Sequence, residues 1–269
     1  MLGGLAEATK TLGLMTAVTC PIMRYHPAIV AQAAATLGVM TDNRFTLGLG
    51  AGERLNEHVV GAGWPGVAER HERLREAVDI IQGLLSGALS TYSGTHFRLD
   101  HAKIFDRPSK KPPVILAAGG ADAAGLAAEA CDGLIVTEPK RDLLAAYRKA
   151  GGKGPRYAEV AVCYASDKEE AQKTAHKYFR WSVAGWPVLA ELPHEEAFAA
   201  ASKHVPVKAV AENVTCGPKI EDYLAAIDKY TKAGCDHIIL NQVGPDQDAF
   251  FAFFKTKLAP ALRMKKKAA

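Results

Sequence analysis

Apolar stretches of two different periodicities alternate along the chain. Continuous apolar, β-branched runs predict buried strands, at 12–20, 45–52, 113–120, 132–137, 158–165 and 237–243. Apolar residues spaced three or four apart predict amphipathic helices, at 27–40, 66–86, 121–131, 140–149, 167–181, 219–233 and 246–262. A hairpin is predicted over 90–105 around Ser93-Gly94, and the stretch from 182 to 216 has no regular period.

The order of these elements predicts the fold class. Strands that alternate with helices form parallel sheets, and near-continuous apolar strands are buried on both faces. The pattern leaves two α/β folds open, a (β/α)8 barrel and an open doubly wound sheet, and about six parallel strands are two short of a closed barrel. We expect one domain over 1–269 with an insertion or lid at about 166–216. The opening LGGLAEATKTLGL is typical of the second half of a helix that lacks a cap, which predicts further sequence upstream.

Composition and charge exclude several function classes. The 269 residues carry a formal net charge of +4, and Lys and Arg are interleaved with Asp and Glu, which argues against nucleic-acid binding. The sequence contains no apolar run of transmembrane length and no signal-peptide pattern, so no membrane partner is predicted. Five cysteines without a CxxC pair favour a reducing cytoplasm. The nine histidines have no metal-ligand spacing, so no metal site is predicted.

The most informative segment is GLGAGERLNE, at 48–57. A buried strand ends there in Gly-Ala-Gly, and glycines allow a sharp turn and the close approach of a flat ligand. Glu53 follows at the strand end, where barrel enzymes carry their active-site groups. Its carboxyl could therefore act as a general acid or base. The competing interpretation is a carboxylate that caps a helix N-terminus.

Two further strand ends could carry chemistry. LAAGGADAAGLA, at 116–127, runs from a strand through Gly119-Gly120 into a helix. This arrangement either points free N–H groups at a phosphate or forms a tight turn only. TAVTCP, at 16–21, ends a strand in small residues before a proline, which suits an unusual backbone conformation. Cys20 has no His or Asp at a telling spacing, so a catalytic thiol is not predicted.

Several of these segments resemble one enzyme family. TAVTCPIMRYHPAIVAQAAATL, LGLGAGERLNEHVVGAGWP, ILAAGG, RHERLREAVDII, CGP and NQVG are similar to the F420-dependent oxidoreductases of the luciferase-like superfamily, in particular the glucose-6-phosphate dehydrogenase-related subgroup. The resemblance implies a luciferase-like (β/α)8 barrel with coenzyme F420, a 5-deazaflavin, in its C-terminal mouth. It favours the barrel over the doubly wound sheet. The family begins with two further strands, the second ending in an Asp-His pair, that have no counterpart in this sequence.

The resemblance also implies roles for individual residues. Glu53 matches the active-site acid of the family. A non-prolyl cis peptide behind the deazaflavin ring maps to Ala17-Val18, and ring and ribityl contacts map to Cys20, where the family has Thr, and to Asn56. The amides that hold the cofactor phosphate map to Ala118, Gly119, Gly120 and Ala121. The positions that bind a sugar phosphate map to Thr137 and Lys140.

Together these observations predict an F420-dependent oxidoreductase. It would transfer hydride between the deazaflavin and an alcohol, carbonyl or related small organic substrate, with Glu53 protonating the ring. Two alternatives stay open: an FMN-dependent luciferase-like monooxygenase on the same fold, and an inactive, truncated cofactor-binding remnant. The resemblance further implies a cytoplasmic homodimer.

Overall fold

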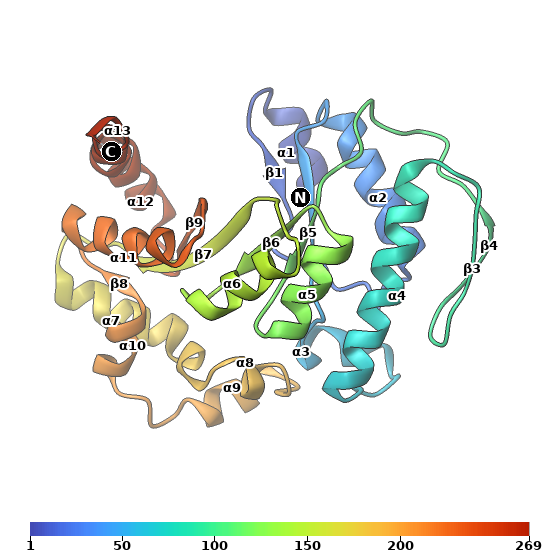
Figure 1. Ribbon diagram of the computed structural model, residues 1–269. Helices are drawn as coiled ribbons and strands as arrows, with labels where there is room; N and C mark the ends of the chain where they lie inside the picture. The colour runs from blue at the N-terminus through green and yellow to red at the C-terminus, as the bar shows by residue number, and fades with distance from the viewer. Residues whose placement is uncertain (269) are drawn as a thin grey trace. The chain divides into compact units, whose positions relative to one another are not determined.

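Parallel strands alternate with helices through the computed structural model, which describes residues 1–268 (Figure 1). The chain groups into two units. Unit 1 comprises Met1–Val136 and Asp142–Arg156, and unit 2 comprises Thr137–Arg141 and the residues from Tyr157 onward. Within residues 1–268, no helix is both long and apolar enough to cross a membrane.

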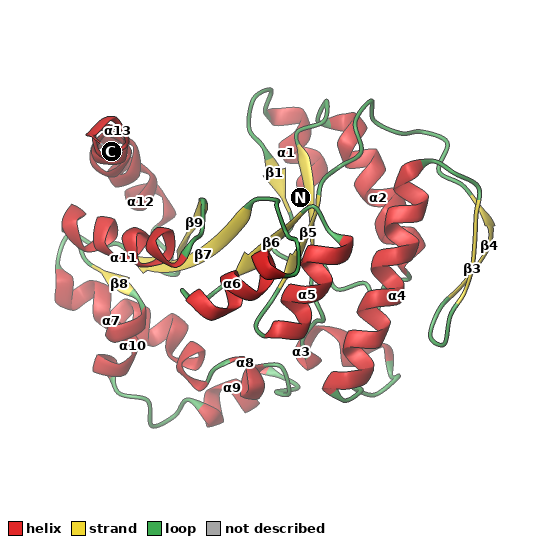
Figure 2. Ribbon diagram, viewed as in Figure 1, coloured by secondary structure: helices red, strands yellow, loops and turns green. Residues whose placement is uncertain are grey.

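Four parallel strands form the sheet of unit 1 (Figure 2). Their order is β1 (Leu14–Met15), β2 (Phe45–Leu49), β5 (Val114–Ala117) and β6 (Gly133–Val136). The helices of this part of the chain are α1 (Leu2–Ala8), α2 (Pro27–Met40), α3 (Arg54–Glu57), α4 (Val67–Ser86), α5 (Ala121–Ala130) and α6 (Arg141–Lys149), with the 3-10 turn η1 at His58–Val60. β6 is buried throughout and β5 nearly so, as expected of parallel strands that are covered on both faces.

The strand predicted over 12–20 is shorter than its apolar pattern suggests. Only β1 joins the ladder regularly, and Thr19 returns to it as an isolated bridge opposite Leu49. Between them the Thr16 hydroxyl takes over the pairing, since its Oγ1 donates to the Gly48 carbonyl at 3.0 Å and accepts from the Gly48 N–H at 2.9 Å. The Thr16 N–H still donates to the Thr46 carbonyl at 3.3 Å, so the backbone leaves the ladder only after Thr16 and returns at Thr19.

The hairpin predicted over 90–105 is present as the antiparallel pair β3 (Ser90–Ser93) and β4 (Arg98–Ala102). Its turn lies on helix α4 and is held by the carboxylate of Glu76. A Cβ built on Gly94 would come within 2.3 Å of Glu76 Oε2, so a larger residue at this position would displace the carboxylate.

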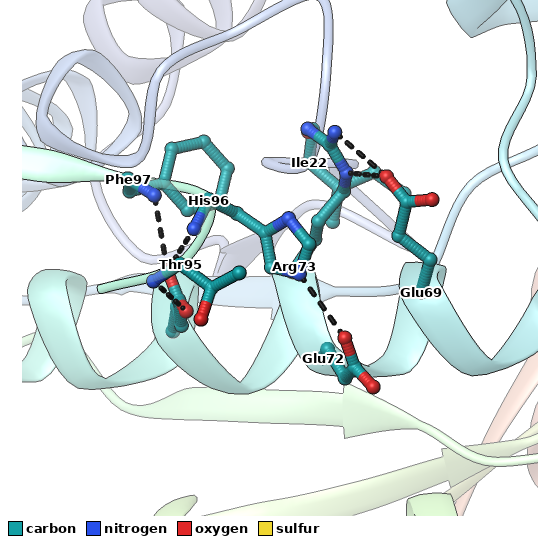
Figure 3. A network of polar contacts seen from close by, with 8 residues as sticks. Ile22, Glu69, Glu72, Arg73, Thr95, His96 and Phe97 are labelled. Carbon is teal, nitrogen blue, oxygen red and sulfur yellow. Dashed lines mark hydrogen bonds and ion pairs between the residues drawn. The ribbon is translucent and has the colours of Figure 1, made fainter.

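Three consecutive N–H groups satisfy Glu76. The amides of Thr95, His96 and Phe97 donate to its carboxylate at 2.7, 3.0 and 3.0 Å, and the His96 ring lies 3.2 Å from Glu72 one turn earlier on α4 (Figure 3). Burial by itself would raise the pKa of Glu76, but the three amides and the charge of His96 bring it below its usual value.

Unit 2 is built around β7 (Arg156–Cys163), which begins at the last residue of unit 1. This strand runs parallel to β9 (His237–Gln242) and, at its C-terminal end, to the two-residue β8 (Thr215–Cys216). Val160 and Val162 of β7 point to one face, where they pack with Tyr223, Phe250 and Phe253. Burying side chains of this size stabilises the unit by about 1.5–3 kcal/mol each.

The helices of unit 2 correct two details of the sequence prediction. They are α7 (Lys168–Phe179), α8 (Trp186–Leu189), α9 (Glu195–Ala201), α10 (Val207–Asn213), α11 (Ile220–Ala233), α12 (Gln247–Phe253) and α13 (Ala259–Ala268), with η2 at Arg180–Ala184 and a π-helical turn η3 at Phe254–Leu258. The stretch 182–216 is therefore largely made of short helices, and the predicted helix 246–262 is interrupted by η3. The six strands expected from the sequence are present as β1, β2, β5, β6, β7 and β9, and the two-residue β8 is a seventh parallel strand that the sequence did not predict.

Candidate functional site

Three segments singled out in the sequence lie together at one edge of the unit 1 sheet. Because β1, β2 and β5 are parallel, the segments that follow them, Thr16–Cys20, Gly48–Glu53 and Ala118–Ala121, emerge at the same edge. A Cβ built on Gly50 would lie 2.7 Å from Cγ2 of Val18 and 3.6 Å from the Cβ of the last residue of β5. The three segments are therefore in direct proximity.

The first segment presents an apolar side chain at this edge. The Ala17-Val18 peptide bond is cis, as the resemblance implies. Gly48 makes room for it, because a Cβ there would lie 1.9 Å from the carbonyl oxygen of Thr16. Val18 stays 40% exposed, and an exposed apolar side chain over a strand rich in glycine offers a contact surface for a flat ligand.

Glu53 carries a carboxyl group that other residues leave available. It occupies the N-cap position of α3, but its side chain makes no capping hydrogen bond. No side chain or amide among residues 1–268 pairs with it, so the capping interpretation does not describe this residue. Glu53 is partly buried, and this burial raises the pKa of its carboxyl. A carboxyl with a raised pKa can hold and deliver a proton.

Cys20 and Asn56, the two predicted ring and ribityl contacts, differ in their chemistry. Burial, followed by the charge of the neighbouring Glu57, raises the pKa of the Cys20 thiol to about 12, so the group stays protonated and is a poor nucleophile at neutral pH. Asn56 is exposed, and its side-chain amide has no partner in the described part of the chain. Such an amide can donate to and accept from a ligand.

The predicted phosphate cradle needs one correction. The amide of Ala118 donates to the carbonyl of Ile135 at 3.0 Å, so the sheet already uses it. The amides of Gly119, Gly120 and Ala121 have no acceptor within residues 1–268, and they lie at the N-terminus of α5. Both glycines are exposed with open space where a Cβ would stand. Three outward amides at a helix start suit an anionic group.

Thr137 and Lys140 belong to unit 2, where both already have partners. The Thr137 hydroxyl accepts from the indole N–H of Trp186 at 3.0 Å, and its carbonyl accepts from the Tyr230 hydroxyl at 3.0 Å. Lys140 forms an exposed ion pair with Glu138 at 2.9 Å. An exposed pair of this kind contributes little to stability. Thr137 and Lys140 both remain predicted substrate contacts.

Sequence reasoning missed Glu57, whose carboxylate is only 1% exposed. The pattern around it is polar and gives no sign of burial, because its partner Arg24 lies 33 residues away in the chain.

No metal centre is visible in the described part of the chain. Within residues 1–268 no three His, Cys, Asp or Glu side chains are grouped so as to hold an ion.

Comparison with known proteins gives consistent matches. Residues 1–237 match the family described as luciferase-like monooxygenase. An F420-dependent glucose-6-phosphate dehydrogenase from Nakamurella multipartita is 32% identical over 282 residues, which cover 97% of this chain and 81% of that protein.

Two solved structures extend the comparison. An F420-dependent secondary alcohol dehydrogenase in complex with an F420-acetone adduct has a TM-score of 0.85 and 28% identity, with 94% of this chain and 81% of that chain covered. A coenzyme F420-dependent tetrahydromethanopterin reductase from Methanopyrus kandleri has a TM-score of 0.78 at 20% identity, with 97% and 86% covered, and so shares the fold.

Proposed function

This chain belongs to the luciferase-like monooxygenase family, and from its similarity to F420-dependent dehydrogenases we propose that it is an F420-dependent oxidoreductase acting on an alcohol, a carbonyl or a related small organic substrate. The predicted fold class is correct: the chain has the α/β fold of the luciferase-like barrels, and the six predicted parallel strands are present. The observation that carries the proposal is the edge of the unit 1 sheet, where Val18, the glycines of 48–52 and the unpaired carboxyl of Glu53 lie together.

The residues at this edge fit a phosphorylated, flat cofactor. The glycines leave a wall without side chains, and the exposed face of Val18 would support the ring. The free amides of Gly119, Gly120 and Ala121 would hold the phosphate at the start of α5. Asn56 would bind polar groups near the ring. When bound, F420 accepts or supplies a hydride and no single electrons.

Glu53 supplies the proton that accompanies the hydride. In the oxidising direction an alcohol loses a hydride from carbon and a proton from oxygen, which leaves a carbonyl product. With F420 bound, Glu53 would hold the proton that the ring needs, and solvent would both return a proton to Glu53 and take up the hydroxyl proton. Atoms and charge then balance, and the remaining task is to hold the two reacting carbons in contact.

A titration tests the proposal directly. F420 is added to the protein and its fluorescence is followed, with FMN added to a second sample under the same conditions. We expect saturable binding of F420 and much weaker binding of FMN. Reduction of bound F420 by members of a panel of secondary alcohols would then identify the reaction. Preferred binding of FMN would favour the monooxygenase alternative, and no binding of either would contradict the proposal.

We also propose that the protein works in the cytoplasm as a homodimer. All five cysteines, including the two neighbours Cys163 and Cys216, are free thiols, which suits a reducing compartment. The homodimer rests on the family resemblance alone. Light scattering after size-exclusion chromatography would give a mass of twice 28.7 kDa if it forms, and a monomer mass would exclude it.

A further inference from the structure

A buried carboxylate has no role in the function proposed above. Glu57 is the last residue of α3 and only 1% exposed. A carboxylate removed from water is costly unless charged or polar groups compensate it. Three compensating contacts come from one short turn, Cys20–Arg24, which directly follows the cis peptide segment.

Arg24 supplies two of these contacts. Its backbone N–H donates to Glu57 Oε2 at 3.0 Å, and its guanidinium Nε lies 3.8 Å from Oε1. The guanidinium also covers the ring of Tyr25 at 4.8 Å. Because a main-chain amide is involved, the contact fixes the path of the backbone and not merely the end of a long side chain.

Cys20 supplies the third contact from the other end of the turn. Its thiol lies beside the carboxylate, and the charge of Glu57 helps to raise the thiol pKa. Gly52 completes the arrangement with a φ of +80°, where a Cβ would come 2.4 Å from the Cys20 sulfur and 3.2 Å from Cγ of Glu57. Cys20, Gly52 and Glu57 are therefore packed without spare room, and Gly52 immediately precedes Glu53.

We infer that Glu57 is a positioning residue, which ties the turn behind Val18 to the loop that carries Glu53. The inference rests on the proposed function, because it assigns Glu57 the task of holding the ring-facing side chain and the proton donor in register. The link runs from the Glu57 carboxylate through Cys20 to Gly52, so a change at Glu57 reaches both sides of the ring-binding edge without any contact to the ligand.

The first test uses the protein without cofactor. Alkylation of Cys20 by N-ethylmaleimide is followed by peptide mass spectrometry in the wild type, in Glu57→Gln and in Glu129→Gln, an exposed carboxylate of unit 1 as control. Removing the Glu57 charge lowers the thiol pKa and loosens the turn. We expect Cys20 to react at least about tenfold faster in Glu57→Gln, as one pKa unit changes the thiolate fraction tenfold, and at the wild-type rate in the control.

The second test measures F420 affinity by fluorescence for the same proteins. We expect Glu57→Gln to weaken F420 binding about tenfold while the control stays within about twofold, differences of about 1.4 and 0.4 kcal/mol. A pair of variants at Arg24, which is not a predicted cofactor contact, covers the case in which Glu57→Gln does not fold. Arg24→Lys keeps a cation toward Glu57 and should bind F420 like the wild type, whereas Arg24→Met removes that cation and should weaken F420 binding, as Glu57→Gln does.

The outcomes separate the inference from the proposed function. If the wild type binds F420, but Glu57→Gln changes neither the affinity nor the alkylation rate, the positioning role is wrong and the function stands. Equal affinities for Arg24→Lys and Arg24→Met would equally overturn it. If the wild type does not bind F420, the proposed function fails, and faster alkylation in Glu57→Gln would support only the contact between Glu57 and Cys20.

Discussion

Gly50 and Val18 lie so close that a Cβ on Gly50 would come within 2.7 Å of Cγ2 of Val18, which would have to move. We expect Gly50→Ala to displace Val18 and to weaken F420 binding about tenfold, a loss of about 1.4 kcal/mol, measured by fluorescence titration. Gly125→Ala within α5 is the control, because a Cβ there meets nothing within 4 Å. It should raise stability by about 0.5–1 kcal/mol and leave F420 affinity unchanged. Unchanged affinity in Gly50→Ala would remove Val18 from the ring contact.

Glu53→Gln tests the proton donor. The amide keeps the shape of the side chain but cannot deliver a proton, so turnover should fall about 10²–10⁴-fold while F420 affinity stays near that of the wild type. Burial raises the pKa of Glu53 above 4.5, and a general acid works only while protonated. The rate of alcohol oxidation should therefore fall as pH rises through this raised pKa. That inflection should be absent in Glu53→Gln, and its persistence there would assign the proton to another group.

Gly119→Val tests the amide cradle. The space around the missing Cβ of Gly119 is open, and the residue is exposed, so the melting temperature should change little. A branched side chain over the free amides should still crowd a phosphate and weaken F420 binding about tenfold or more. Retained affinity would move the phosphate to a different part of the protein.

Glu76→Gln tests the clamp on the β3–β4 turn. In urea unfolding, Glu76→Gln should lower the free energy of unfolding by about 1–2 kcal/mol, a value that already allows for the partial exposure of the site. Glu72→Gln on the same helix, which loses only the contact to the His96 ring, should cost less than about 0.5 kcal/mol.

The pH dependence of stability should follow the same carboxylate. The folded pKa of Glu76 lies below the usual value of 4.5. Its contribution is therefore complete above that value and is lost as pH falls through the folded pKa. Wild type and Glu76→Gln should converge in stability on acidification, and a constant difference between them would mean that the charge of Glu76 is not involved.

The sequence predicts the framework better than it predicts the contacts. Each of the six parallel strands has an apolar run, and the hairpin has its Ser93-Gly94 turn, because local composition determines these elements. The sequence could not predict that the Glu53 carboxyl makes no hydrogen bond, because a carboxylate at a helix start commonly caps the helix and this one does not. The burial of Glu57 depends on a turn 33 residues away. The engaged amide of Ala118 depends on the register with β6.

The three unpaired amides at the start of α5 have a consequence for selectivity. Main-chain N–H groups respond to negative charge and to little else, so residues 119–121 would hold any compact phosphate regardless of the organic group attached to it. Substitutions of one small side chain for another at these positions would not change the affinity for phosphate. Simple phosphate esters should compete for the same place, and discrimination between one ring system and another has to be achieved entirely at the opposite end of the bound molecule.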